Sequence, residues 1–142
     1  MRTIQEISAA LHATLDPEQE WSRLARLASE LETHPDAVHA LPVVLALYER
    51  FPKADFGIPG PLAHAIEKHH GEEYVRLLTE SLERKPTEQT LFLAERMLNA
   101  RDQFAPNMVT ALQSVAMRPD VDRVLRDEAT RIIARHSCPR QS

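Results

Sequence analysis

Apolar residues recur every three or four positions along most of this chain of 142 residues, and that spacing limits its fold more than any other feature. The run of Trp21, Leu24, Ala28 and Leu31 is typical, because residues three and four positions apart share one face of an α-helix. No segment sustains the alternation of apolar and polar residues that characterises a half-buried strand. The sequence therefore predicts an all-α fold of about eight helices.

Residues that favour helix ends predict several of the boundaries. Thr3 and Glu6 have the spacing of a capping box, in which each side chain accepts a hydrogen bond from the other residue's backbone N–H. Asp16 followed by Pro17 predicts the start of a second helix. Gly71 predicts a left-handed stop at the end of a short helix.

Four prolines are nearly evenly spaced, at successive separations of 35, 34 and 33 positions: Pro17, Pro52, Pro86 and Pro119. Residues 49–52 and 83–86 share the pattern Glu-Arg-x-Pro. A period in the thirties is typical of helical-hairpin repeats, in which neighbouring pairs share one core, although evenly spaced helix starts would give the same pattern. The tetratricopeptide and ankyrin patterns are absent. We therefore expect HEAT-like helical hairpins stacked as a right-handed, α-solenoid-like bundle.

Composition predicts a single cytoplasmic domain over residues 1–136, with a flexible tail over 137–142. The one cysteine, Cys138, permits no intramolecular disulfide, which fits a reducing compartment. The first residues lack the apolar stretch of a signal peptide, and no run approaches the ~18 apolar residues of a membrane span. A net charge of −4 argues against a nucleic-acid partner, which usually meets a basic face.

No pattern of catalytic or metal-binding residues emerges. His64, His69 and His70 cluster with Glu67, but His64 and His69 are five positions apart, whereas two ligands on one helix face need three or four. Neither a nucleophile elbow nor a phosphate-binding glycine loop occurs. We expect no catalytic residue, no metal and no cofactor, and hence a binding protein. A small all-α enzyme of unrecognised type stays the less favoured alternative.

Three segments resemble, in order, the motifs of one protein family. Residues 56–67 contain FGIPGPLAH and a following Glu, which is similar to a GSPGPLVHxxE signature. Residues 83–87 read ERKPT, as in the family, and residues 93–99 read LAERMLN, which is similar to MLNRxLN. The chain thus resembles, over roughly residues 45–100, the small all-helical immunity proteins of bacterial contact-dependent growth inhibition and other polymorphic toxin systems.

This resemblance implies a function. Immunity proteins of this group bind and neutralise a cognate toxin domain in the cytoplasm by protein–protein contact. Many such toxin domains are nucleases with basic clefts, which an acidic helical protein could cover by mimicking phosphate charge. The alternative is a HEAT-like adaptor for a partner unrelated to toxins, since curved helical stacks offer extended binding surfaces.

The toxin is expected to contact the acidic side chains around the Gly/Pro segment, with one aromatic anchor: Asp55, Phe56, Glu67, Glu72 and Glu73. The alternative is that these carboxylates form a solvated rim. Architectural roles are expected for Gly57, Pro59, Gly60, Pro61, Pro86, Arg96 and Asn99. Gly60 would cap a helix that starts at Pro61, Gly57 would permit a turn, and Pro59 would keep its neighbour out of helical conformation. Arg96 and Asn99 would make buried or semi-buried hydrogen bonds.

Overall fold

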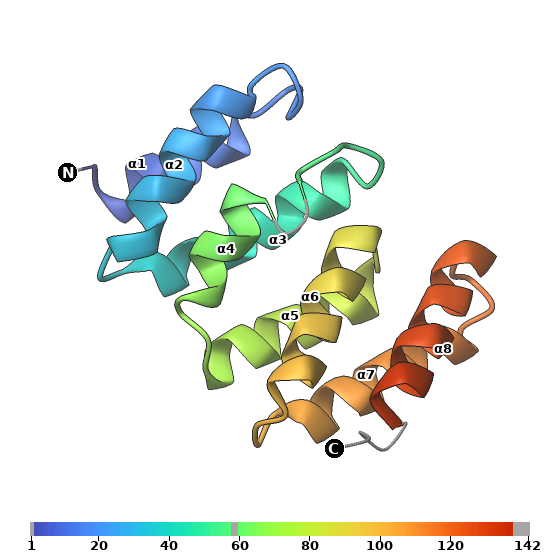
Figure 1. Ribbon diagram of the computed structural model, residues 1–142. Helices are drawn as coiled ribbons and strands as arrows, with labels where there is room; N and C mark the ends of the chain where they lie inside the picture. The colour runs from blue at the N-terminus through green and yellow to red at the C-terminus, as the bar shows by residue number, and fades with distance from the viewer. Residues whose placement is uncertain (1, 58–59, 138–142) are drawn as a thin grey trace. The chain divides into compact units, whose positions relative to one another are not determined.

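A computed structural model of the protein describes residues 2–57 and 60–137 (Figure 1). In these residues the regular structure consists of eight α-helices and one short 3-10 helix, with no strand. In chain order they are α1 (Ile4–His12), α2 (Trp21–Thr33), η1 (Ala37–Ala40), α3 (Leu41–Arg50), α4 (Pro61–Glu67), α5 (Glu72–Arg84), α6 (Glu88–Ala100), α7 (Ala105–Met117) and α8 (Arg123–Ser137). The all-α prediction with about eight helices is confirmed.

The evenly spaced prolines mark a repeat of helix pairs. Each of the four lies in the segment that joins an odd-numbered α-helix to the even-numbered one after it. We call these four segments the pair loops: residues 13–20, 51–60, 85–87 and 118–122. The proline spacing is therefore the spacing of successive helix pairs along the chain.

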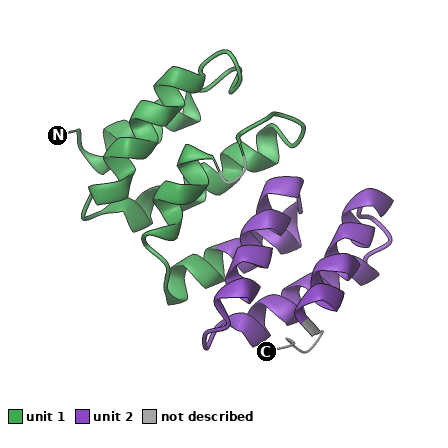
Figure 2. Cartoon of the chain, viewed as in Figure 1, with its two compact units in different colours: residues 1–77 green, residues 78–142 purple. Residues whose placement is uncertain are grey.

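The helices group into two compact units, residues 1–77 and 78–142, with the division inside α5 (Figure 2). In the first unit α1 packs against α2, η1 and α3, and α2 packs along α4. In the second unit α6, α7 and α8 pack against one another. The single domain over 1–136 stays a prediction, and residues 138–142 of the expected tail lie outside the described residues.

Arginine side chains bond the carbonyl ends of two odd-numbered helices. The Arg50 guanidinium, at the end of α3, donates to the carbonyl oxygens of Leu11 at 3.4 Å and Thr14 at 3.5 Å, just past α1. Arg118, which follows α7, donates to the carbonyl oxygens of Leu82 at 3.3 Å and Glu83 at 2.5 Å, in the last turn of α5. An α-helix leaves its last four carbonyls without an intrahelical partner, so each arginine satisfies groups of the preceding helix pair.

The capping box predicted at Thr3 is confirmed, and the left-handed stop predicted at Gly71 is wrong. Thr3 and Glu6 form the capping box, with N–H to oxygen distances of 2.9 and 3.1 Å. Gly71 does not supply a left-handed stop: the glycines with positive φ in the described residues are Gly57 and Gly60. The helix instead ends at Glu67, with Lys68 at its C-cap in right-handed helical conformation.

The Gly/Pro segment has the mechanical role that the sequence predicts. Gly60 is the N-cap of α4 with φ +82°, Pro61 is the first helical residue, and Gly57 turns the chain with φ +86°. Gly60 also lies against the backbone, because a Cβ built on it would be 1.9 Å from the carbonyl oxygen of Phe56. No residue with a side chain fits there. Pro59 lies outside the described residues.

Replacing Gly60 with alanine should therefore destabilise the protein by at least about 2 kcal/mol, from backbone strain together with the clash at Phe56. Gly71→Ala is the matched control, since no atom lies within 4 Å of the Cβ it would add. We expect that control to change stability by no more than about 1 kcal/mol. Urea unfolding followed by circular dichroism measures both. Equal midpoints for the two variants would contradict the conformation described for the 51–60 pair loop.

Candidate protein-interaction surface

The large apolar side chains that stay exposed in the described residues lie at or beside pair loops. They are Leu15 (85% exposed), Trp21 (40%), Met117 (83%) and Val124 (66%). Leu15 lies in the first pair loop and Trp21 begins α2, while Met117 ends α7 and Val124 is the second residue of α8. Single exposed apolar residues are ordinary, but exposed apolar area that gathers in one kind of place marks a candidate contact surface.

The 13–20 pair loop is held by its own carboxylates. The Asp16 Oδ1 atom accepts hydrogen bonds from the backbone N–H groups of Glu18 and Gln19, at 3.1 and 3.3 Å. Glu20 Oε2 accepts from the N–H groups of Leu15 and Asp16, at 2.9 and 2.7 Å. These bonds fix a turn that presents the Leu15 side chain to solvent.

The predicted start of the second helix is wrong, because this turn precedes it. Asp16 and Pro17 were expected to open it, but α2 begins at Trp21 because the two carboxylates satisfy the backbone groups of the preceding turn. Trp21 was also expected on the buried face with Leu24. It is instead partly exposed, whereas Leu24 is buried.

The 51–60 pair loop lies directly against the 13–20 pair loop. Glu18 Oε2 accepts a hydrogen bond from the Asp55 N–H at 3.2 Å, and Asp55 Oδ1 accepts one from the Gly57 N–H at 2.9 Å. Gly57 also faces the indole, because a Cβ on it would come within 3.1 Å of Trp21 Cη2. The glycine therefore lets the loop pack against the tryptophan ring.

A groove of about 450 Å³ lies between these two pair loops. We call it the loop groove, and it is lined by residues 15–18 and 50–54. Its wall includes the half-buried Phe51 ring, over which the Arg50 guanidinium lies at 5.2 Å from the centroid. An apolar hollow rimmed by a few polar groups is the usual form of a binding site.

The carboxylates at the loop groove have no cationic partner. Asp16, Glu18 and Asp55 accept hydrogen bonds from backbone N–H groups, and none pairs with a Lys, Arg or His among residues 2–57 and 60–137. Arg23 donates to the Ala10 carbonyl at 2.7 Å and pairs with Glu20. Arg50 lines the groove and donates to carbonyls at the end of α1. The groove therefore carries both signs of charge, because Asp16 and Glu18 line it together with Arg50 and Lys53.

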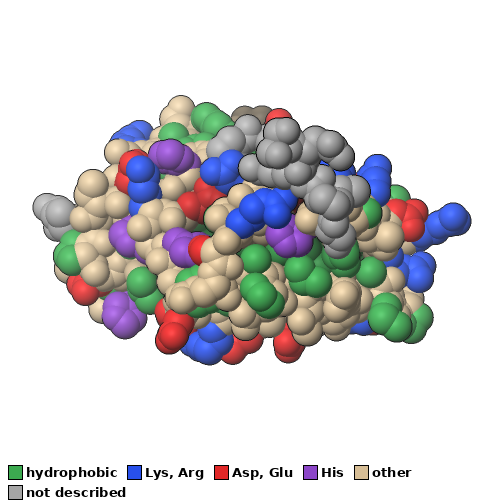
Figure 3. All heavy atoms as spheres, turned by 60° about the horizontal axis from the view of Figure 1, so that its bottom comes forward, with side chains coloured by type: hydrophobic (Ala, Val, Ile, Leu, Met, Phe, Trp, Pro, Cys, Tyr) green, Lys and Arg blue, Asp and Glu red, His purple; other side chains and the backbone are tan. Residues whose placement is uncertain are grey.

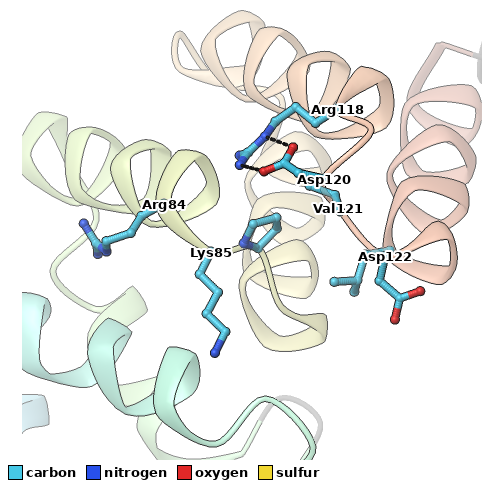
Figure 4. Close-up of a pocket in the computed structure, with 8 residues that line it drawn as sticks. Arg84, Lys85, Arg118, Asp120, Val121 and Asp122 are labelled. Atoms are coloured by element: carbon cyan, nitrogen blue, oxygen red, sulfur yellow. Dashed lines mark hydrogen bonds and ion pairs between the residues drawn. The ribbon is translucent and has the colours of Figure 1, made fainter.

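The second unit has a smaller hollow between its own pair loops, of about 210 Å³ (Figure 4). It is lined by Arg84, Lys85, Pro86, Arg118, Asp120, Val121, Asp122 and Leu125. Here the central carboxylate is neutralised, because Asp120 accepts two hydrogen bonds from the Arg118 guanidinium, at 2.9 and 3.2 Å. That pairing lowers the pKa of Asp120 and raises the pKa of Arg118.

The acidic residues proposed from the sequence lie at or beyond the two ends of α4. Asp55 is exposed at the loop groove, but Glu67 ends α4, whose seven residues separate the two ends of the helix by about 10 Å. Glu72 and Glu73 are exposed in the first turn of α5, beyond that end of α4, and Glu73 pairs with Arg76. The structure therefore leaves Asp55 at the groove and places the three glutamates at or beyond the opposite end of α4.

Two of these residues are turned inward. Phe56 was expected to be an exposed anchor, but it is 3% exposed and packs edge-on against Tyr48, with ring centroids 4.9 Å apart. Glu67 is half-buried, and its Oε1 atom has no exposure to solvent. Burial raises the pKa of Tyr48, and the nearby Tyr74 and Glu67 raise it further. These residues belong to the core of the first unit, so Phe56 is corrected from contact residue to core residue.

The residues of the second unit that were expected to have architectural roles differ in burial. Pro86 is buried, as a structural role requires. Arg96 and Asn99 were expected in buried or semi-buried positions, but both are exposed on α6. The Arg96 guanidinium lies 5.7 Å from the centroid of Phe92, four residues earlier on the same helix. The burial expected for these two residues is therefore wrong.

The histidines contact backbone and acidic groups near helix ends. His69 Nε2 lies 3.0 Å from the Leu31 carbonyl oxygen, and His64 lies 3.9 Å from a Glu32 oxygen. Within the described ranges no three His, Cys, Asp or Glu side chains are arranged to hold a metal ion. On the face seen in Figure 3, acidic, basic and histidine side chains are interspersed.

Sequence reasoning missed Leu15 and Trp21 for identifiable reasons. Leu15 falls outside the helical pattern, directly before Asp-Pro, and an apolar residue in a turn of that kind is a usable signal of exposure. Trp21 fits the helical spacing, so its exposure depends on where α2 begins.

Comparisons of the chain with models of protein families, with curated proteins and with solved structures give no match in any of the three. No helix in the described residues combines the length and the apolar character needed to cross a membrane.

The 13–20 pair loop should loosen in acid through Glu20. Hydrogen bonds from the N–H groups of Asp16 and Leu15, and then from Arg23, lower the pKa of the Glu20 carboxyl. Its stabilising effect is therefore complete above the unfolded value of about 4.3 and is lost as the pH falls through the lower folded value. An NMR titration should give a Glu20 midpoint below 4.3, with the Leu15 and Asp16 amide signals shifting together. Glu20→Gln should remove that shared transition; a midpoint at or above 4.3 would refute the geometry of the turn.

Proposed function

We propose that this protein is an immunity protein that binds and neutralises a cognate toxin domain, of nuclease type, in the cytoplasm. The observation that carries the proposal is the loop groove of the first unit, where the exposed Leu15 side chain lies among charged side chains of both signs. Protein interfaces commonly combine an apolar centre with a polar rim. The three motifs within residues 56–99 supply the specific class.

The second part of the proposal is that the helix pairs follow a HEAT-like, right-handed repeat. Helices two apart in sequence pack together, α1 with α3 and α2 with α4 in the first unit, and α6 with α8 in the second. Such packing is expected when successive helical hairpins stack. The arginine-to-carbonyl bonds of Arg50 and Arg118 repeat the same contact in two pairs.

An inhibitor of this kind requires a rigid surface rather than chemistry of its own. Residues 13–20 are held by the Asp16 and Glu20 hydrogen bonds, and residues 55–57 by the Glu18–Asp55 and Asp55–Gly57 contacts. A preorganised surface loses less conformational entropy on binding, which favours affinity. The charged side chains that line the groove would accelerate association with a toxin surface of complementary charge.

Co-expression tests the proposal. The toxin domain should be encoded at the 3′ end of a large gene directly upstream, and this chain should restore growth to cells that express that domain. It should also co-purify with a toxin domain carrying an inactivating substitution. If the chain neither restores growth nor co-purifies, it is not the immunity protein of that toxin. Restored growth without a complex would instead argue against neutralisation by direct contact.

A further inference from the structure

We infer that His34 is a pH-sensitive latch: its neutral ring joins the first residues of the chain to the turn after α2, and a proton on that ring breaks the link to the turn. The inference goes beyond the proposed function, because it concerns how the first unit holds itself together and not what it binds. It rests on two hydrogen bonds that meet on one buried ring.

The sequence His34-Pro35-Asp36 places the ring beside a turn. A residue before proline is disfavoured in helical conformation, and His34 accordingly follows α2 with extended backbone, at φ −75° and ψ 131°. The His34 carbonyl oxygen accepts a hydrogen bond from the Ala37 N–H at 3.2 Å, which closes the turn. Proline has no N–H, so the first backbone donor after the histidine is Asp36. Its N–H donates to His34 Nδ1 at 3.0 Å.

The second ring nitrogen fixes the protonation state of the histidine. His34 Nε2 lies 3.1 Å from the carbonyl oxygen of Arg2. A carbonyl oxygen only accepts, so Nε2 carries a proton, and a backbone N–H only donates, so Nδ1 carries none. The two bonds together therefore require the neutral ring with its proton on Nε2. The side chain is 5% exposed, so water has little access to replace either bond.

A proton on Nδ1 would set a ring N–H against the Asp36 N–H, and two donors cannot bond each other. Histidine is the side chain that ordinarily gains its proton between about pH 8 and pH 5. In the unfolded chain the Asp36 contact is absent, so nothing there opposes protonation. The stabilisation from this bond is therefore complete above the unfolded value of about 6.5 and is lost as the pH falls below it.

The charged groups on the segments that touch the ring do not change over this range. Arg2 pairs with Glu30 of α2 at 3.2 Å. Glu6 of α1 is held in the capping box, and the Asp36 carboxylate is exposed. Carboxylates and guanidinium groups ordinarily stay ionised between about pH 5 and pH 8. The change near the latch is therefore the proton on the imidazole itself.

Three other histidines lie on neighbouring segments, and protonation acts on them differently. His69 Nε2 lies 3.0 Å from the Leu31 carbonyl oxygen, which accepts from the neutral and the protonated ring alike. His64 lies 3.9 Å from a Glu32 oxygen, and a proton strengthens that attraction. His39 of η1 is exposed, so water solvates its charge. A loss of stability in mild acid is therefore specific to the latch.

The test is an NMR titration of the full chain from about pH 8 to about pH 5, which follows the histidine ring nitrogens and the backbone amides together. His34→Asn is the informative variant, because an asparagine oxygen accepts from the N–H two residues on and gains no proton in this range. His69→Gln is the matched control, since the amide keeps a donor for the Leu31 carbonyl. Circular dichroism verifies that both variants fold, and thermal unfolding at the two pH limits measures their stability.

At the upper pH, the ring nitrogen signals of His34 should be those of the neutral form with the proton on Nε2. On acidification, the Asp36 amide signal should shift with the same midpoint as the His34 ring. His34→Asn should abolish that shift, and its Tm should fall by about 3 °C less between the two limits than that of the unsubstituted chain. His69→Gln should leave both results unchanged.

The unsubstituted chain decides the matter even if His34→Asn fails to fold. A proton on Nδ1 at the upper pH would overturn the inference, as would a His34 ring that titrates while the Asp36 amide signal stays in place. A ring that stays neutral until the whole chain unfolds would also contradict it, because the latch would then never open in the folded protein. With a folded His34→Asn, an unchanged Asp36 transition or an equal fall in Tm has the same consequence.

Discussion

The carbonyl ends of α1 and α5 impose the constraint on which the rest of the structure depends. Backbone carbonyls near a helix end must find donors, and here arginines of other helices provide them: Arg23 and Arg50 at the end of α1, and Arg118 at the end of α5. Arg50 and Arg118 are 68 positions apart, twice the spacing of Pro52 and Pro86. In the first unit, Arg50 also lines the loop groove, beside the two pair loops. One backbone requirement thus connects the repeat of helix pairs to the surface proposed to bind a partner.

Local signals were sufficient to predict the fold class and several helix ends. The apolar spacing indicated the helices, Thr3 and Glu6 form the capping box, and Gly60 with Pro61 begins α4 as expected. The start of α2 could not be predicted in the same way. Asp16 and Pro17 are equally suited to a turn, and the outcome depends on Glu20, whose carboxylate bonds the backbone of that turn.

The candidate site was harder to predict, because exposure is a property of tertiary packing. Asp55 was identified from its place beside the Gly/Pro segment and does lie at the groove. Phe56, the next residue, points to the other side of the chain and packs on Tyr48. The two glycines explain the difference: turns at Gly57 and Gly60 fold the segment so that its aromatic ring is buried and its carboxylate is not. Leu15 and Trp21 come from a different helix pair, so no reading of residues 55–64 alone could associate them with this site.

Hydrogen exchange of the chain, alone and in complex with the toxin domain encoded upstream, tests the central claim most directly, because it reports where the partner covers the backbone. The account predicts that peptides from residues 13–21 and 51–57 become protected in the complex, while peptides from residues 68–73 exchange as in the free protein. Protection at residues 68–73, with unchanged exchange at the two pair loops of the first unit, would contradict it.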